Sequence, residues 1–155
     1  MRLAFEADTG DDGQTIGAAS FSLTELEKTS PEQWLSLWER SETTPEEAVA
    51  MSDNPKPRIA ITMNVGKLRD IRTDLDEEAR LDVVGDPWDK FFDDDGTVKS
   101  GVEPPPGAQG HCALSGLGVK APRPISKPVM RDLRRQLLEY VNGPEVTREP
   151  VSPAP

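Results

Sequence analysis

Residues 2–23 constrain the fold most, because they predict two short strands joined by an acidic loop. Leu3 and Phe5 alternate with more polar neighbours, and Phe21 and Leu23 do the same. The sequence between these pairs is rich in aspartate and glycine, which favours a turn-rich loop. The rest of the chain is expected either to complete this sheet or to extend from it.

Composition limits the size of the hydrophobic core. The chain has 155 residues, enough for one domain, but only 35% of them are hydrophobic and 30% are charged. There are 15 prolines, and most of them lie in the C-terminal third of the sequence. We therefore expect about half of the chain to fold compactly and the remainder to be extended.

Charge and cysteine content exclude several classes of protein. A net charge of −10 argues against binding to nucleic acid and against simple binding to anionic membranes. Cys112 is the one cysteine, so no internal disulfide can form, which fits a reducing compartment. No apolar run approaches the roughly 20 residues that span a bilayer, and the N-terminus lacks a signal-peptide pattern. We expect an intracellular protein whose association with any membrane would be peripheral.

Two segments carry signals for the start of a helix. Residues 30–33 place a serine before a proline and a glutamine three positions after the serine, which predicts a capped helix running through Trp38. The alternative is a strand over residues 33–37. Residues 44–47 repeat the capping pattern and predict a second short helix.

The clearest strand prediction covers residues 58–65. Ile59, Ile61, Met63 and Val65 alternate with smaller or polar residues and would share one face of a sheet.

Regular structure is harder to predict beyond this strand. Residues 67–128 are first strongly charged and then rich in proline and glycine, which predicts a long irregular arm. Residues 129–142 predict an amphipathic helix that Asn-Gly-Pro ends, and residues 143–155 predict a proline-rich tail, either disordered or clamped. The expected fold is mixed: a mainly β part over residues 1–66, the arm, and a C-terminal helix.

Two groups of apolar residues are expected to contact a partner protein. Three aromatic residues follow Pro87 in an otherwise polar stretch and resemble a surface anchor. The apolar stripe of the C-terminal helix is too narrow for a core of its own, so we expect this helix to pack on another chain and not mainly on residues 1–66. The candidate partner-binding residues are Trp88, Phe91, Phe92, Met130, Leu133, Leu137 and Tyr140.

Four short segments occur in an order known from one family of β-sandwiches. Residues 6–8 are Glu-Ala-Asp before the acidic loop, residues 16–17 are Ile-Gly, residues 18–23 are small or hydrophobic, and residues 57–61 alternate. In this order they resemble the C-terminal half of a C2 domain, the antiparallel β-sandwich of many calcium- and membrane-binding proteins. The resemblance implies a partial C2-like sandwich in the N-terminal part.

The resemblance also implies a calcium site built from Asp8, Asp11 and Asp12. However, Glu6 replaces the first aspartate of the family pattern and Gln14 falls where the third would be. The family's other calcium loop would lie upstream of this sequence. Calcium takes roughly six to eight oxygen ligands, so we expect an incomplete cage and a solvated acidic hairpin, and no other cofactor.

The expected function is that of a non-enzymatic accessory subunit of a larger protein assembly, docking through the C2-like region and the irregular arm. Residues 67–128 are too polar to bury themselves, so a partner surface would have to offset the entropy lost on ordering them. One alternative is a calcium- or phospholipid-responsive C2-type module. A third is an enzyme using Cys112 and His111, which we expect least because sequence neighbours rarely face each other as nucleophile and base.

Overall fold

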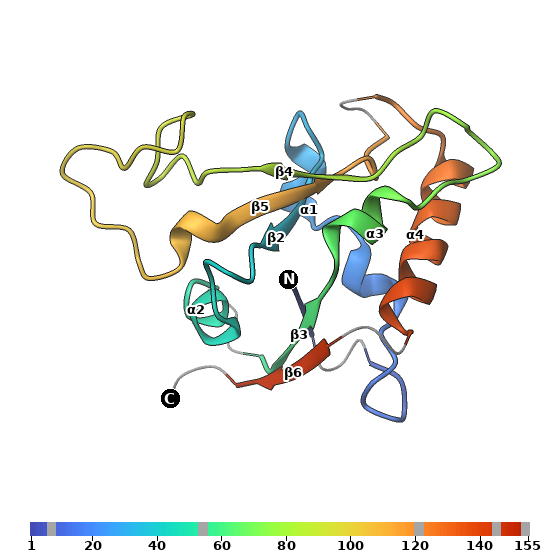
Figure 1. Cartoon of the computed structure of the whole chain (residues 1–155), viewed down its shortest axis with the longest axis horizontal. Coiled ribbons are helices and arrows are strands. Elements are labelled where there is room, and N and C mark those ends of the chain that lie inside the picture. Colours follow the sequence, from blue (N-terminus) through green and yellow to red (C-terminus); the bar gives the residue numbers. More distant parts are fainter. Residues whose placement is uncertain (6–8, 53–55, 120–122, 144–146, 153–155) are drawn as a thin grey trace.

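The computed structural model describes residues 1–5, 9–52, 56–119, 123–143 and 147–152. Its strands form two three-stranded antiparallel sheets (Figure 1). The first sheet has the order β1 (Arg2–Phe5), β3 (Arg58–Thr62) and β6 (Thr147–Val151). The second has the order β2 (Leu35–Trp38), β5 (His111–Ser115) and β4 (Asp82–Gly85). Each sheet therefore joins segments that lie far apart in the sequence.

Short helices surround the sheets. Among the described residues they are α1 (Glu25–Thr29), α2 (Pro45–Ala50), α3 (Val65–Arg69), α4 (Lys127–Val141) and the 3-10 helices η2 (Ala18–Phe21) and η3 (Ala108–Gly110). The longest, α4, runs along one side of the molecule, and α2 packs beside β6 and β1 (Figure 1). The mixed, mainly β fold with a C-terminal helix is therefore confirmed.

One hydrophobic core connects both sheets with α4. Ile59 and Ile61 of β3 point into it, whereas Ala60 between them faces a second, smaller cluster. The main core also contains Leu35, Leu37, Leu114, Leu133, Leu137 and Val141. The sheets also meet directly, because the backbones of Met1 and Trp38 exchange two hydrogen bonds of 2.6 and 2.8 Å.

Three of the predicted elements have the expected local signals. Thr44 caps α2 in a complete capping box with Glu47. Ser126 caps α4, where its Oγ accepts a hydrogen bond from the Val129 amide at 3.3 Å. The predicted strand at residues 58–65 is confirmed as far as Thr62, after which the chain turns into α3.

Two predictions for the N-terminal third were wrong. Residues 18–23 contain the 3-10 helix η2 and not a strand. This helix buries Phe21 beneath α4. Residues 30–38 contain β2 and not a helix. The alternative prediction, a strand over residues 33–37, was therefore correct about the type of element, although β2 begins and ends later. Gln33 has a φ of 51°, which breaks a right-handed helix at the third position after the expected cap.

The region predicted to be irregular is mostly so, but it contributes two strands to the second sheet. Residues 67–128 supply β4 and the central strand β5, and the predicted tail supplies β6 with Pro150 on a sheet edge. Gly116 ends β5 with a φ of 103°, and a Cβ at this position would lie 2.0 Å from the Arg80 carbonyl oxygen. The glycines that predict a loop here instead allow two chain segments to approach closely.

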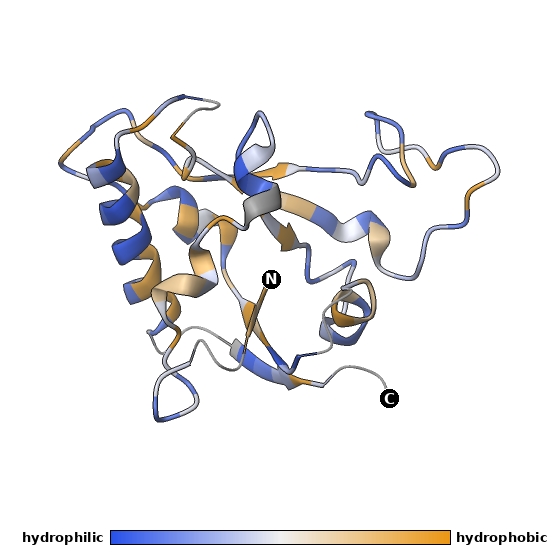
Figure 2. Ribbon diagram, turned by 180° about the vertical axis from the view of Figure 1, so that it is seen from behind, coloured by the Kyte–Doolittle hydropathy of each residue, from blue (hydrophilic) through white to orange (hydrophobic). Residues whose placement is uncertain are grey.

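The prediction that α4 packs on another chain was also wrong. Leu133 and Leu137 are 0% exposed within this chain's own core. Met130 and Tyr140 are half-buried against the same core, and the Tyr140 hydroxyl accepts a hydrogen bond from the Asn64 amide at 3.0 Å. Figure 2 shows the hydrophobic side of α4 turned toward the sheets and its hydrophilic side turned outward. A narrow stripe suffices because both sheets supply the opposing surface.

Candidate functional site

The most prominent surface feature is residues 86–107, here named the projecting loop. This segment leaves the second sheet after β4 and returns to it through η3. In Figure 1 it reaches away from the body of the molecule on the side opposite α4. Side chains on its outer part are therefore presented at a distance from the main hydrophobic core.

Backbone hydrogen bonds shape the outer part of the projecting loop into a small hairpin. The Lys99 amide donates to the Phe91 carbonyl at 2.9 Å, and the Asp93 amide donates to the Thr97 carbonyl at 2.8 Å. Gly96 closes the turn with a φ of 83°, a backbone conformation that favours glycine. The loop thus has a defined conformation of its own.

Ring contacts fix the base of the projecting loop to the second sheet. The Trp88 ring centroid lies 5.2 Å from that of Trp38 and 5.0 Å from that of His111. His111 and Trp38 are opposite each other on β5 and β2, with ring centroids 4.9 Å apart. Phe91 continues the series outward, 6.0 Å from Trp88. The predicted aromatic cluster therefore exists and is anchored at one end.

The hairpin exposes apolar side chains among acidic ones. Val98 is 47% exposed and Phe91 is half-buried, whereas Phe92 is 6% exposed and forms a β-bridge with Val98. Sequence reasoning missed Val98, although an apolar residue on each side of an Asp-Asp-Asp-Gly turn is a hairpin signal. The exposed acidic residues nearby are Asp89, Asp93, Asp94 and Asp95.

His111 holds the first residue of the projecting loop. Its Nδ1 lies 2.6 Å from the Asp86 carbonyl oxygen, and because a carbonyl only accepts, Nδ1 carries the proton. Burial lowers the pKa of His111, which the backbone contact and the charge of Asp86 partly oppose. Burial raises the pKa of the Asp86 carboxyl, and the nearby charges of Glu32 and Asp89 add to this effect. His111 is therefore a neutral anchor at neutral pH.

Cys112 and His111 do not form a catalytic pair. As neighbours on β5 their side chains point to opposite faces of the sheet. His111 contacts Trp38 and Trp88, whereas Cys112 packs against the main core. Burial also raises the pKa of the Cys112 thiol, which disfavours the nucleophilic thiolate.

The acidic N-terminal loop is organised as a turn. The Asp12 carboxylate accepts hydrogen bonds from the amides of Gln14 and Thr15, both at 2.8 Å, and from the Thr15 hydroxyl at 2.6 Å. These bonds lower the pKa of Asp12 to about 2, with the Thr15 hydroxyl making the largest contribution. Asp8 lies outside the described residues. Among the described residues, no group of three or more histidine, cysteine, aspartate or glutamate side chains is placed to hold a metal ion.

The structure separates the residues predicted to bind a partner. Trp88 and Phe91 remain accessible on the projecting loop, and Phe92 supports the hairpin from within. Leu133 and Leu137 have no exposed surface to offer a partner. In the described part of the chain, no helix combines the length and the apolar composition needed to cross a bilayer.

Comparisons of the chain with protein-family models, with curated proteins and with solved structures gave no match.

Proposed function

We propose that this protein is a non-enzymatic accessory subunit of a larger protein assembly and that it docks through the projecting loop. The observation that supports this most is a hairpin with its own hydrogen bonds that presents Val98 and Phe91 to solvent. An isolated surface valine is ordinary, but an aromatic and an aliphatic side chain together on an anchored extension suit an interface centre.

The charge around these side chains defines the partner surface. Between residues 86 and 103 the loop carries six acidic side chains and only two lysines. Lys90 lies over the Phe91 ring, with Nζ 5.3 Å from the ring centroid. Protein interfaces commonly have an apolar centre and a polar or charged rim. The partner should therefore offer an apolar pocket bordered by lysine or arginine, which would also speed association.

Anchoring of the loop lowers the entropy lost on binding. The contact of Trp88 with Trp38 and His111 and the bond from His111 to Asp86 restrict the base of the loop before any partner arrives. A preorganised segment loses less conformational freedom on association than a disordered one. The likeness of residues 2–66 to half of a C2 domain stays a separate proposal, on which this one does not depend.

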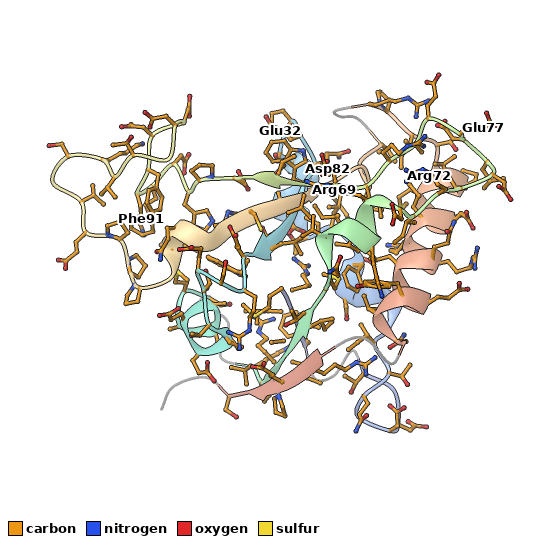
Figure 3. The ribbon with its side chains drawn as sticks, in the orientation of Figure 1. Glu32, Arg69, Arg72, Glu77, Asp82 and Phe91 are labelled. Carbon is orange, nitrogen blue, oxygen red and sulfur yellow. The ribbon has the colours of Figure 1, made fainter. Side chains whose placement is uncertain are left out.

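Affinity capture with matched variants tests the proposal. Val98→Asp and Phe91→Ala alter the exposed hairpin, and Leu75→Asp is the control because Leu75 is 62% exposed on another loop. Leu75 lies in sequence between Arg72 and Glu77, which Figure 3 places at the opposite end of the molecule from Phe91. Truncating a central interface side chain typically costs about 2 kcal/mol or more of binding free energy. The loop variants should therefore bind the partner about 30-fold more weakly.

The same protein should be recovered with the original chain and with Leu75→Asp, and be lost with both loop variants. Circular dichroism should show that all three variants keep their fold, because the altered side chains are at the surface. Recovery that is unchanged by Val98→Asp and Phe91→Ala would refute docking through the projecting loop.

A further inference from the structure

A cavity of about 610 Å³ lies between β1, β2, η2 and α2. Its lining does not include Phe91 or Val98, the exposed side chains of the hairpin. Its volume is within the range of about 300–1,000 Å³ that is typical of small-molecule sites. Two arginines, His111 and five serine or threonine residues line it, together with the rings of Phe5, Trp38 and Trp88.

The described lining of the cavity carries basic side chains, whereas the whole chain is acidic. The chain has 28 acidic and 18 basic residues, yet none of the described residues that line this cavity is an aspartate or a glutamate. Arg2 and Arg58 both contribute to its wall. The Arg58 guanidinium lies over the Phe5 ring at 3.8 Å from the centroid, and its Nη2 donates to the Ser52 hydroxyl at 3.1 Å. Such a lining favours an anion.

Arg2 is held in place by two backbone carbonyl groups and by an ion pair with Glu27. Its Nε donates to the Ser20 carbonyl at 3.1 Å and its Nη1 to the Ser36 carbonyl at 2.8 Å. Nη1 also donates to Glu27 Oε1 at 3.4 Å, which makes an ion pair at one side of the guanidinium. Nη2 makes no hydrogen bond within the described part of the chain. Because the side chain is only 13% exposed, burial lowers the pKa of Arg2, so an added anion would stabilise its charged form.

A buried hydroxyl beside Arg2 also has no partner. Ser20 lines the cavity and is 3% exposed, and its Oγ makes no hydrogen bond with any described residue. A buried hydroxyl without a partner costs free energy, and such groups are rare in folded proteins. A ligand oxygen that accepts from this hydroxyl would remove that cost.

We infer that this cavity binds a small organic anion that has a flat ring. The ring lies against the partly exposed Trp88, next to the buried Trp38, and a carboxylate or phosphate group accepts hydrogen bonds from Arg2 and Ser20. The aromatic wall supplies stacking surface, and the charge of Arg2 makes the hydrogen bonds stronger than those between neutral groups.

Two-dimensional NMR of the tryptophan indole N–H groups provides the test. Trp38 and Trp88 line the cavity and Trp34 does not, so Trp34 is an internal control. The probes are benzoate, phenyl phosphate, benzyl alcohol and inorganic phosphate. We expect at least one ring anion to shift the Trp38 and Trp88 signals at concentrations about tenfold lower than either benzyl alcohol or inorganic phosphate. The tighter ring anion then identifies the preferred acidic group.

Variants connect the signal to the proposed contacts. Arg2→Gln should weaken binding by about tenfold or more, and Ser20→Ala should weaken it by a few-fold. The melting temperature of Ser20→Ala should not fall, because the Oγ that is removed makes no internal hydrogen bond with any described residue. Arg135→Gln, on the exposed face of α4, should bind as the original chain does. If Arg2→Gln does not fold, the affinity of the Ser20→Ala variant for the ring anion decides whether the inference holds. The inference is overturned if neither ring anion shifts these signals at about 5 mM, if benzyl alcohol binds as tightly, or if Ser20→Ala binds unchanged.

Discussion

Replacing Leu137 by alanine should destabilise this protein strongly without any partner being present. Leu137 is 0% exposed and lies in the core that joins both sheets to α4. A buried leucine-to-alanine change loses the transfer free energy of the removed carbons and leaves a cavity, together about 3–5 kcal/mol. A domain of this size has a total stability of about 5–15 kcal/mol, so a large share would be lost.

Urea unfolding followed by circular dichroism measures this effect on the isolated chain. A loss of about 3 kcal/mol also corresponds to a fall in melting temperature of roughly 6–12 °C. Leu75→Ala is the matched control, because the same atoms are removed from a side chain that is 62% exposed, and it should cost under about 0.5 kcal/mol. If Leu137→Ala cost no more than the control, α4 would not belong to this chain's core.

Three further predictions concern local contacts. Lowering the pH from 7.5 to 5.5 should reduce the free energy of unfolding, because burial lowers the pKa of His111 in the folded protein. The unfolded chain therefore binds more protons than the folded one as the pH falls below about 6.5. Thermal unfolding of His111→Asn at both pH values should show a weaker dependence on pH. The carboxyl carbon of Asp12 should titrate in NMR with a pKa of about 2, and Thr15→Val should raise that pKa; an ordinary value in the original chain would disprove the turn geometry. Gly116→Ala should destabilise by more than about 1 kcal/mol in urea unfolding, because the added carbon would meet the Arg80 carbonyl at a positive φ; unchanged stability would contradict the close approach.

Local sequence signals predicted those elements whose causes are local. The capping box at Thr44, the Ser126 cap with the following proline, and the alternation at Ile59 and Ile61 each act within a few residues. The sequence also located the aromatic residues at Trp88, because their grouping in a polar stretch is visible without a structure. It could not show what anchors them, since Trp38 and His111 come from distant segments.

The failures occurred where distant segments decide the outcome. Residues 30–38 carry a helix-start pattern, but Gln33 turns the chain and β5 supplies a strand partner for β2. Strand β5 is short and is followed by glycine, so nothing local distinguishes it from a loop. The burial of α4 likewise depends on the second sheet, whose strands β4 and β5 lie in segments that the sequence predicts to be irregular, so its narrow stripe alone favours a partner chain.

A site-specific photo-crosslinker in place of Val98 would report directly whether the projecting loop docks onto a partner protein. The same crosslinker in place of Leu75 is the control, because both positions are exposed and lie on different loops. We expect position 98 to crosslink to one defined partner protein, the crosslinked peptide of that partner to carry basic residues, and position 75 to give no such product. Equal crosslinking from both positions, or crosslinking from position 75 alone, would contradict docking through this loop.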